Sequence, residues 1–151
     1  MMKKRSIKRF LRYIYLKLVR IQDTPEKIAL SFSVGVFIGI FPTFGLGGII
    51  MILICYLFKL NYIAGILGTF IMNYFTSPFF WALSYMLGDF ITTGEIKWRG
   101  LERTGAKIFI LRYLLGNLII SILFSILSYF VVKNIIITYR KRKRKVKPSS
   151  S

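Results

Sequence analysis

Three long stretches of the chain contain no charged residue. Residues 28–58, 60–88 and 113–132 form uncharged runs of 31, 29 and 20 residues. Because about 20 apolar residues cross the hydrocarbon core of a bilayer, each run is long enough to span one. The pattern predicts an all-α integral membrane protein with three hydrophobic segments, in a membrane domain over residues 23–133.

The first two segments are interrupted by proline. Pro42 cannot donate a hydrogen bond to a helix, and Gly45 and Gly47 follow it closely. A straight helix over residues 28–58 would be about 46 Å long, against about 30 Å of hydrocarbon. Pro78 interrupts residues 60–88 in the same way. We therefore predict a broken hairpin over 28–58 and a kinked span over 60–88, with re-entrant or kinked helices at the two prolines.

The segments around these spans are polar and mostly basic. Apolar residues recur at helical spacing over residues 5–20, which predicts a basic amphipathic cytoplasmic or interfacial helix within residues 1–22. Residues 89–112 are predicted to form a polar loop, and 113–132 an ordinary transmembrane helix. The strongly basic segment 134–151 is predicted to be a disordered tail.

Two topologies fit these segments. Basic residues concentrate at both ends of the chain, and the positive-inside rule then puts both termini in the cytoplasm. An even number of crossings follows, with a re-entrant hairpin for 28–58, a kinked crossing for 60–88 and a second crossing for 113–132. The alternative is three full crossings, which leaves seven basic residues outside. The first topology is favoured, in the inner (cytoplasmic) membrane as a multi-pass protein.

Composition excludes several functions. The chain is 55% hydrophobic and 19% charged, with a net charge of +18, no histidine and one cysteine. Without histidine, one chain cannot form a Ser-His-Asp triad or a Cys-His pair, and no metal site or cofactor is predicted. Outside the amino-terminal turn the acids are Asp89, Glu95 and Glu102, and nothing in their setting indicates a positioned acid–base group, so we predict that the protein is not an enzyme. Its basic clusters flank apolar spans, which favours the lipid bilayer and anionic lipids as partners, and no nucleic acid.

The two breaks are the candidate binding site. Non-helical backbone at membrane depth is tolerated where it is buried or lines a wet cavity. A helix that begins there directs unpaired N–H groups and its positive dipole end inward, which suits an anionic lipid head group or small anion. The candidate binding residues are Pro42, Thr43, Gly45, Gly47, Asn73, Thr76, Ser77 and Pro78.

Each of these motifs also has a purely structural interpretation. Proline and glycine are common in membrane helices, and an asparagine in a helix bundle often bonds to a neighbouring helix. Ser31, Gly35 and Gly39 lie four residues apart, so they give one helix a groove of small residues. We assign this groove to helix packing, because small residues allow a second helix to approach closely.

The order of these motifs resembles the domain of unknown function 2062 family of bacterial membrane proteins. The resemblance is carried by Thr24-Pro25, Gly35, Gly39, Phe41-Pro42-x-x-Gly45, Gly68-Thr69-x-x-x-Asn73-x-x-Thr76-x-Pro78 and Tyr85-x-x-Gly88. It covers residues 10–135 and implies a small helical membrane domain. Tyr74 departs from the family pattern, which usually has proline directly after the asparagine. The family has no agreed activity, but similar domains are sometimes appended to glycosyltransferases that use lipid-linked substrates.

Two functions follow from this reading. The first is a membrane protein that binds or translocates an anionic lipid head group or small anion at the broken helices. The alternative is a non-catalytic membrane anchor or accessory subunit of a lipid-processing enzyme such as a glycosyltransferase. Because three apolar segments are few for a transporter, a homodimer that completes the cavity is expected for the first function.

Overall fold

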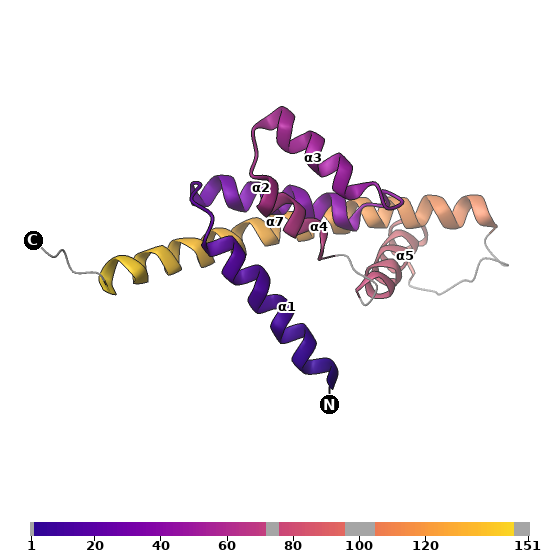
Figure 1. The fold of residues 1–151 in the computed structure, drawn as a ribbon. Coiled ribbons are helices and arrows are strands. Elements are labelled where there is room, and N and C mark those ends of the chain that lie inside the picture. Colours follow the sequence, from indigo (N-terminus) through magenta and orange to yellow (C-terminus); the bar gives the residue numbers. More distant parts are fainter. Residues whose placement is uncertain (1, 72–75, 96–104, 147–151) are drawn as a thin grey trace, which may run out of the picture.

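The computed structural model describes residues 2–71, 76–95 and 105–146, which form six helices and no strand. Their order along the chain is α1 (Met2–Val19), α2 (Pro25–Ile40), α3 (Gly47–Phe58), α4 (Tyr62–Thr69), α5 (Ser77–Thr93) and α7 (Ala106–Val146). The all-helical prediction is confirmed. Figure 1 shows α2 lying along the long helix α7, with α3 folded back over α2 and α1 diverging from the bundle.

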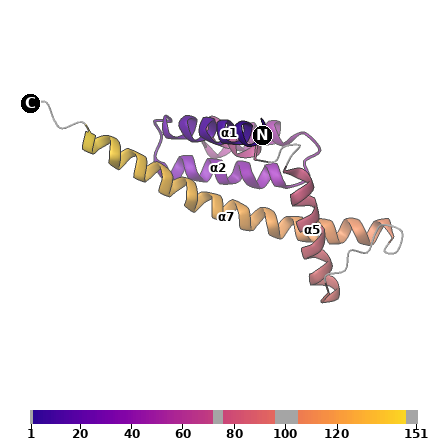
Figure 2. The same cartoon turned by 90° about the horizontal axis from the view of Figure 1, so that it is seen from below.

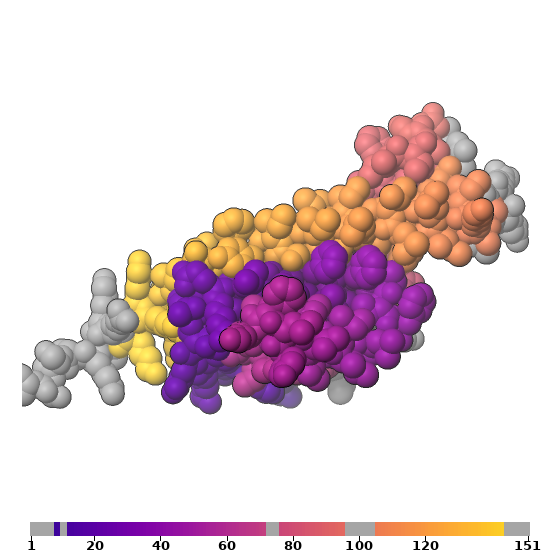
Figure 3. Space-filling model, turned by 90° about the horizontal axis from the view of Figure 1, so that it is seen from above, coloured from indigo at the N-terminus to yellow at the C-terminus, as the bar shows by residue number. Residues whose placement is uncertain are grey.

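Helix α2 is the centre of the bundle, antiparallel to α7. Glu26, in the first turn of α2, pairs with Lys133 of α7 at 3.5 Å. Further along α2, the Ser33 carbonyl accepts a hydrogen bond from the Ser125 hydroxyl of α7 at 2.8 Å. Apolar side chains from α1, α2, α4, α5 and α7 form one continuous core around it. Helices α2, α3 and α4 cover one side of α7, and α5 crosses α7 at a steep angle (Figures 2 and 3).

Glycines bring two pairs of helices into backbone contact. A Cβ atom on Gly35 would meet the carbonyl oxygen of Gly65, and one on Gly39 would lie 2.8 Å from the Thr69 carbonyl oxygen. At the crossing of α5 and α7, a Cβ on Gly88 would meet the Arg112 carbonyl, and one on Gly116 the Ser84 carbonyl. Each of these crossings therefore depends on the missing side chain.

Polar groups tie α1, α2, α4 and α7 together at one end of the bundle, here called the basic end. Asn61 donates to the Asp23 carboxylate at 2.5 Å, which lowers the pKa of Asp23, and its backbone N–H donates to the Ser31 hydroxyl at 2.8 Å. The Arg140 guanidinium donates to the backbone carbonyls of Ile21 and Asp23 at 2.8 and 2.5 Å. The loop after α1, the loop before α4 and the last part of α7 therefore meet here.

Helix α7 is much longer than predicted. The prediction limited the last helix to 113–132, with a polar loop before it and a disordered tail after it, but helix runs from Ala106 to Val146. Arg140 holds the extension against the turn after α1, and basic residues near a helix C-terminus are favoured by the helix dipole. Helix α5 also continues to Thr93, so the predicted loop over 89–112 was wrong at both of its ends.

Among the described residues, α7 is the one helix long and apolar enough to cross a membrane. Of the most apolar 18 residues of α7, only 28% are buried inside the bundle, whereas the residues of a core helix in a soluble protein would be mostly buried. The other two apolar runs are divided into shorter helices, so three full-length hydrophobic segments are not confirmed. Large apolar side chains are exposed along α3, α5 and α7, as expected of a surface in contact with lipid.

Candidate functional site

The two proline breaks open onto one shared cavity of about 1250 Å³. The loop between α2 and α3 forms one wall, and the first two turns of α5 form another. The end of α4 and residues 109–114 of α7 complete the lining. Six of the eight predicted binding residues line this cavity: Pro42, Thr43, Gly45, Gly47, Ser77 and Pro78.

The first break is a tight loop. Helix α2 ends at Ile40, and the N–H of the next residue, Phe41, donates to the Phe37 carbonyl at 2.9 Å. A turn follows, in which the Leu46 N–H donates to the Thr43 carbonyl at 3.0 Å. Gly45 has a φ of 88°, in the left-handed region where glycine is favoured. Within the described part of the chain, the Thr43 hydroxyl makes no hydrogen bond, and it is available to a molecule in the cavity.

The second break is described from Thr76 onward. The Thr76 hydroxyl donates to the Ile71 carbonyl at 2.7 Å, so this residue closes the break and does not line the cavity. Ser77 and Pro78 occupy the first turn of α5 and do line it. Asn73 lies outside the described residues.

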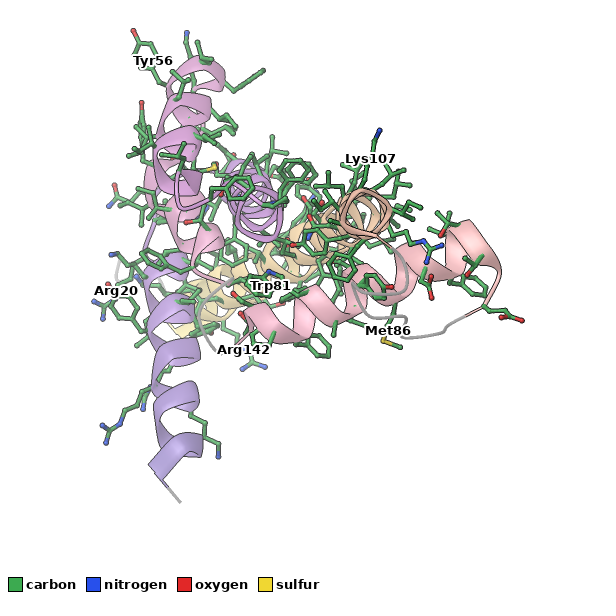
Figure 4. The ribbon with its side chains drawn as sticks, turned by 90° about the vertical axis from the view of Figure 1, so that its right-hand side faces the viewer. Arg20, Tyr56, Trp81, Met86, Lys107 and Arg142 are labelled. Carbon is green, nitrogen blue, oxygen red and sulfur yellow. The ribbon has the colours of Figure 1, made fainter. Side chains whose placement is uncertain are left out.

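The remaining lining is mostly apolar and aromatic. Trp81, Ala82 and Tyr85 project from α5, and Phe109 and Tyr113 from α7. The Tyr85 and Phe109 rings stack with their centroids 4.6 Å apart. Met86 leaves α5 on the opposite side from Trp81 (Figure 4). This wall suits a hydrocarbon chain.

The N-cap residues of the helices that begin at the cavity differ from those of the helices that begin at the basic end. Thr24 accepts from the Lys27 N–H at 3.3 Å to cap α2, and Asn61 accepts from the Ala64 N–H at 3.0 Å to cap α4. Leu46 and Thr76, the N-cap residues of α3 and α5, make no such side-chain hydrogen bond to their helices. First-turn N–H groups and the positive ends of two helix dipoles therefore converge on one apolar cavity.

Asn117 of α7 joins the two walls. Its amide nitrogen donates to the Ile40 carbonyl at the end of α2 and to the Ser84 hydroxyl of α5, each at 3.2 Å. Ser84 in turn donates to the Phe80 carbonyl at 2.7 Å. Both side chains are fully buried, and among the described residues the Asn117 amide oxygen has no hydrogen-bond partner. This one residue fixes the end of α2 relative to α5.

A buried ion pair lies beside the cavity. The Arg112 guanidinium is 2.5 Å from the Asp89 carboxylate, and their side chains are 12% and 1% exposed. The pair links α5 to α7 at the Gly88 end of their glycine crossing. Arg112 Nε is buried and has no hydrogen-bond partner in the described part of the chain.

The small residues assigned to helix packing lie away from most of the cavity. Gly35 and Gly39 are against α4, and Gly39 also reaches the cavity edge. Ser31 donates to the Lys27 carbonyl at 2.6 Å and accepts the Asn61 N–H, so it belongs to the basic end.

Sequence reasoning missed Asn117, Arg112 and the aromatic wall. An amide inside the uncharged run 113–132 was a usable signal, because a polar group at membrane depth needs a partner. Tyr85 belongs to the Tyr85-x-x-Gly88 motif of the family resemblance but was not assigned to the site, and nothing local marked Phe109, because aromatic residues are frequent throughout this sequence.

A family model described as "Uncharacterized protein conserved in bacteria (DUF2062)" matches residues 8–145. The chain belongs to this family. The matched region of this DUF2062 protein contains both breaks, the cavity and the basic end. No match was found in the comparisons with curated proteins and solved structures.

Proposed function

We propose that this DUF2062 protein binds an anionic lipid in the cavity between its two broken segments. The observation that carries the proposal is that two helices, α3 and α5, begin on one apolar cavity. A phosphate group at these N-termini would accept N–H hydrogen bonds and lie at two positive dipole ends. The Thr43 hydroxyl is placed to add a further contact.

The rest of the cavity suits the hydrocarbon part of such a ligand. Its walls are aromatic and aliphatic, and the volume of about 1250 Å³ exceeds that of common small-molecule sites. Among the described residues, no lysine or arginine lines it. A free, strongly hydrated anion would gain little from these walls, whereas a lipid brings its own apolar chain.

The proposal includes a membrane orientation. Lys133 and Arg140 hold the last part of α7 at the basic end, where α2 begins and where Lys59 follows the end of α3. The α2–α3 hairpin would thus enter and leave on the same side, with its tip near the far end of the apolar part of α7. We place the basic end in the cytoplasm, as the positive-inside rule favours.

Cysteine labelling tests this orientation. In a Cys55→Ser background, single cysteines at Gln22, Lys59 and Glu95 would be exposed to an impermeant thiol reagent on intact cells. We expect Glu95→Cys to react, and Gln22→Cys and Lys59→Cys to react only after permeabilisation. Three full crossings would place Lys59 outside and Glu95 inside, which reverses the result at both positions.

Trp81 is a native reporter of lipid in the cavity. In a Trp98→Phe background reconstituted in nanodiscs, brominated phosphatidylglycerol should quench Trp81 at a lower mole fraction than brominated phosphatidylcholine. Ala82→Phe adds a ring to the cavity wall and should weaken this preferential quenching about ten-fold. The control change Met86→Phe, one turn further along α5 and outside the cavity lining, should alter it by less than about two-fold.

Equal quenching by the two lipids would contradict a site for an anionic head group. The same holds if Ala82→Phe and Met86→Phe behave alike while both proteins keep wild-type helicity. Either result would favour the accessory role, in which the breaks serve only to fold the bundle.

A further inference from the structure

A second hollow lies at the basic end, between α1 and α7. It has a volume of about 710 Å³. Tyr15 lines it from α1, and all the other lining residues come from α7. Tyr15 and Tyr139 meet edge to face there, with their ring centroids 6.3 Å apart. The α7 lining consists of Asn134, Ile135, Thr138, Tyr139, Arg142 and Lys143. We call it the α1–α7 groove.

Polarity in this groove changes in a fixed order along α7. Asn134, Thr138 and Arg142 are four residues apart and so lie on one face of the helix, over about 12 Å. Asn134 follows Lys133, where the apolar part of α7 ends, and Arg142 and Lys143 lie farthest from it. The groove thus runs from neutral amide and hydroxyl groups next to the apolar section to two cations farther out. Figure 4 labels Arg142 at this distal part of α7.

The two cations of the groove have no acidic partner among the described residues. Lys133 pairs with Glu26, Lys27 pairs with Asp23, and Arg140 donates to backbone carbonyls. Arg142 and Lys143 take part in no such contact in the described ranges, and both are exposed. Their positive charge is therefore available to an anion from outside the chain.

We infer that the α1–α7 groove binds the head group of an anionic phospholipid in the leaflet at the basic end. Its phosphate lies at Arg142 and Lys143, where a guanidinium can form two parallel hydrogen bonds to phosphate oxygens. The neutral donors Thr138 and Asn134 face the glycerol and ester region, and the acyl chains continue along the apolar part of α7. The order of groups along α7 matches the order of groups along a phospholipid.

This groove is independent of the cavity between the breaks. The cavity is lined by residues 109–114 of α7, and the groove by residues 134–143. About 20 residues of helix, or about 30 Å, separate them. Each can therefore be present without the other.

The variant Thr138→Val distinguishes specific binding of a head group in the groove from non-specific attraction of a basic segment to an anionic membrane. It removes one hydroxyl, keeps the side-chain volume and leaves the net charge unchanged. We expect it to weaken phosphatidylglycerol binding about three-fold, as loss of one hydrogen bond does. The double variant Arg142→Gln/Lys143→Gln should weaken binding at least ten-fold. Arg12→Gln/Lys141→Gln removes two exposed charges outside the groove and should change it less than about two-fold.

Binding would be measured by native mass spectrometry of the full chain in detergent, with phosphatidylglycerol and phosphatidylcholine as probes. All variants would carry Ala82→Phe, so that lipid in the cavity does not enter the count. Equal losses in the two double variants, or no effect of Thr138→Val, would overturn the inference. Equal competition by soluble sn-glycerol 3-phosphate would show a site for free phosphate esters and would overturn the lipid assignment.

Discussion

Replacing Asp89 with asparagine is expected to lower the free energy of unfolding by about 3–5 kcal/mol. Asp89 is almost fully buried, and its carboxylate accepts a charged hydrogen bond from Arg112. Removing one charge leaves the Arg112 guanidinium buried without its counter-ion, with Nε already lacking a partner among the described residues. The measurement is thermal or denaturant unfolding in detergent, followed by circular dichroism.

The double variant Asp89→Asn/Arg112→Gln provides the control for this pair. It removes both charges, so no uncompensated ion remains, and it should recover most of the lost stability. If Asp89→Asn alone lowers the stability by less than about 1 kcal/mol, water reaches the pair and it is not buried as described. A double variant less stable than Asp89→Asn would show that the pair itself stabilises the α5–α7 crossing.

The second large effect is expected at Gly35. Gly35→Ala would place a methyl group against the carbonyl oxygen of Gly65, and a backbone group cannot move aside without displacing α4. We expect a loss of about 1–3 kcal/mol of stability, as for overpacking in a protein core. Thermal unfolding in detergent would measure it.

Gly48→Ala is the matched control. Gly48 is also helical, but a Cβ there meets nothing within 4 Å. Because alanine favours helix over glycine, this change should leave the stability unchanged or raise it by up to about 1 kcal/mol. Equal effects at Gly35 and Gly48 would mean that α2 and α4 are not in backbone contact.

The sequence allowed the helix breaks to be predicted because their causes are local. Proline lacks an N–H and glycine accepts a positive φ wherever they occur, so the interruptions near Pro42 and Pro78 follow from the local sequence alone. That the two breaks face one cavity does not follow, because it depends on how α5 crosses α7. The crossing is set by Gly88 and Gly116, which lie 28 residues apart in the sequence.

The ends of the last helix were harder to predict, because they too depend on contacts between residues far apart in the sequence. The absence of charge marks residues that tolerate lipid, and it was used to place the ends of the last helix. Helix α7 continues past Lys133 because Arg140 finds backbone carbonyls in the turn after α1, more than 110 residues earlier in the chain. Such a partner is invisible in a local window of sequence.

The crossing of α5 and α7 has a mechanical consequence. At Gly88 and Gly116 the two backbones are in direct contact, because neither glycine has a Cβ atom to hold them apart. The segment of α5 from Ser84 back to Ser77 is about 10 Å long, and the cavity lies at its Ser77 end. Phe80, within this segment, packs edge to face against Phe124 of α7. A rotation of α5 by about 10° about this crossing would move Ser77 by about 2 Å, and the Asp89–Arg112 ion pair at the same crossing opposes it.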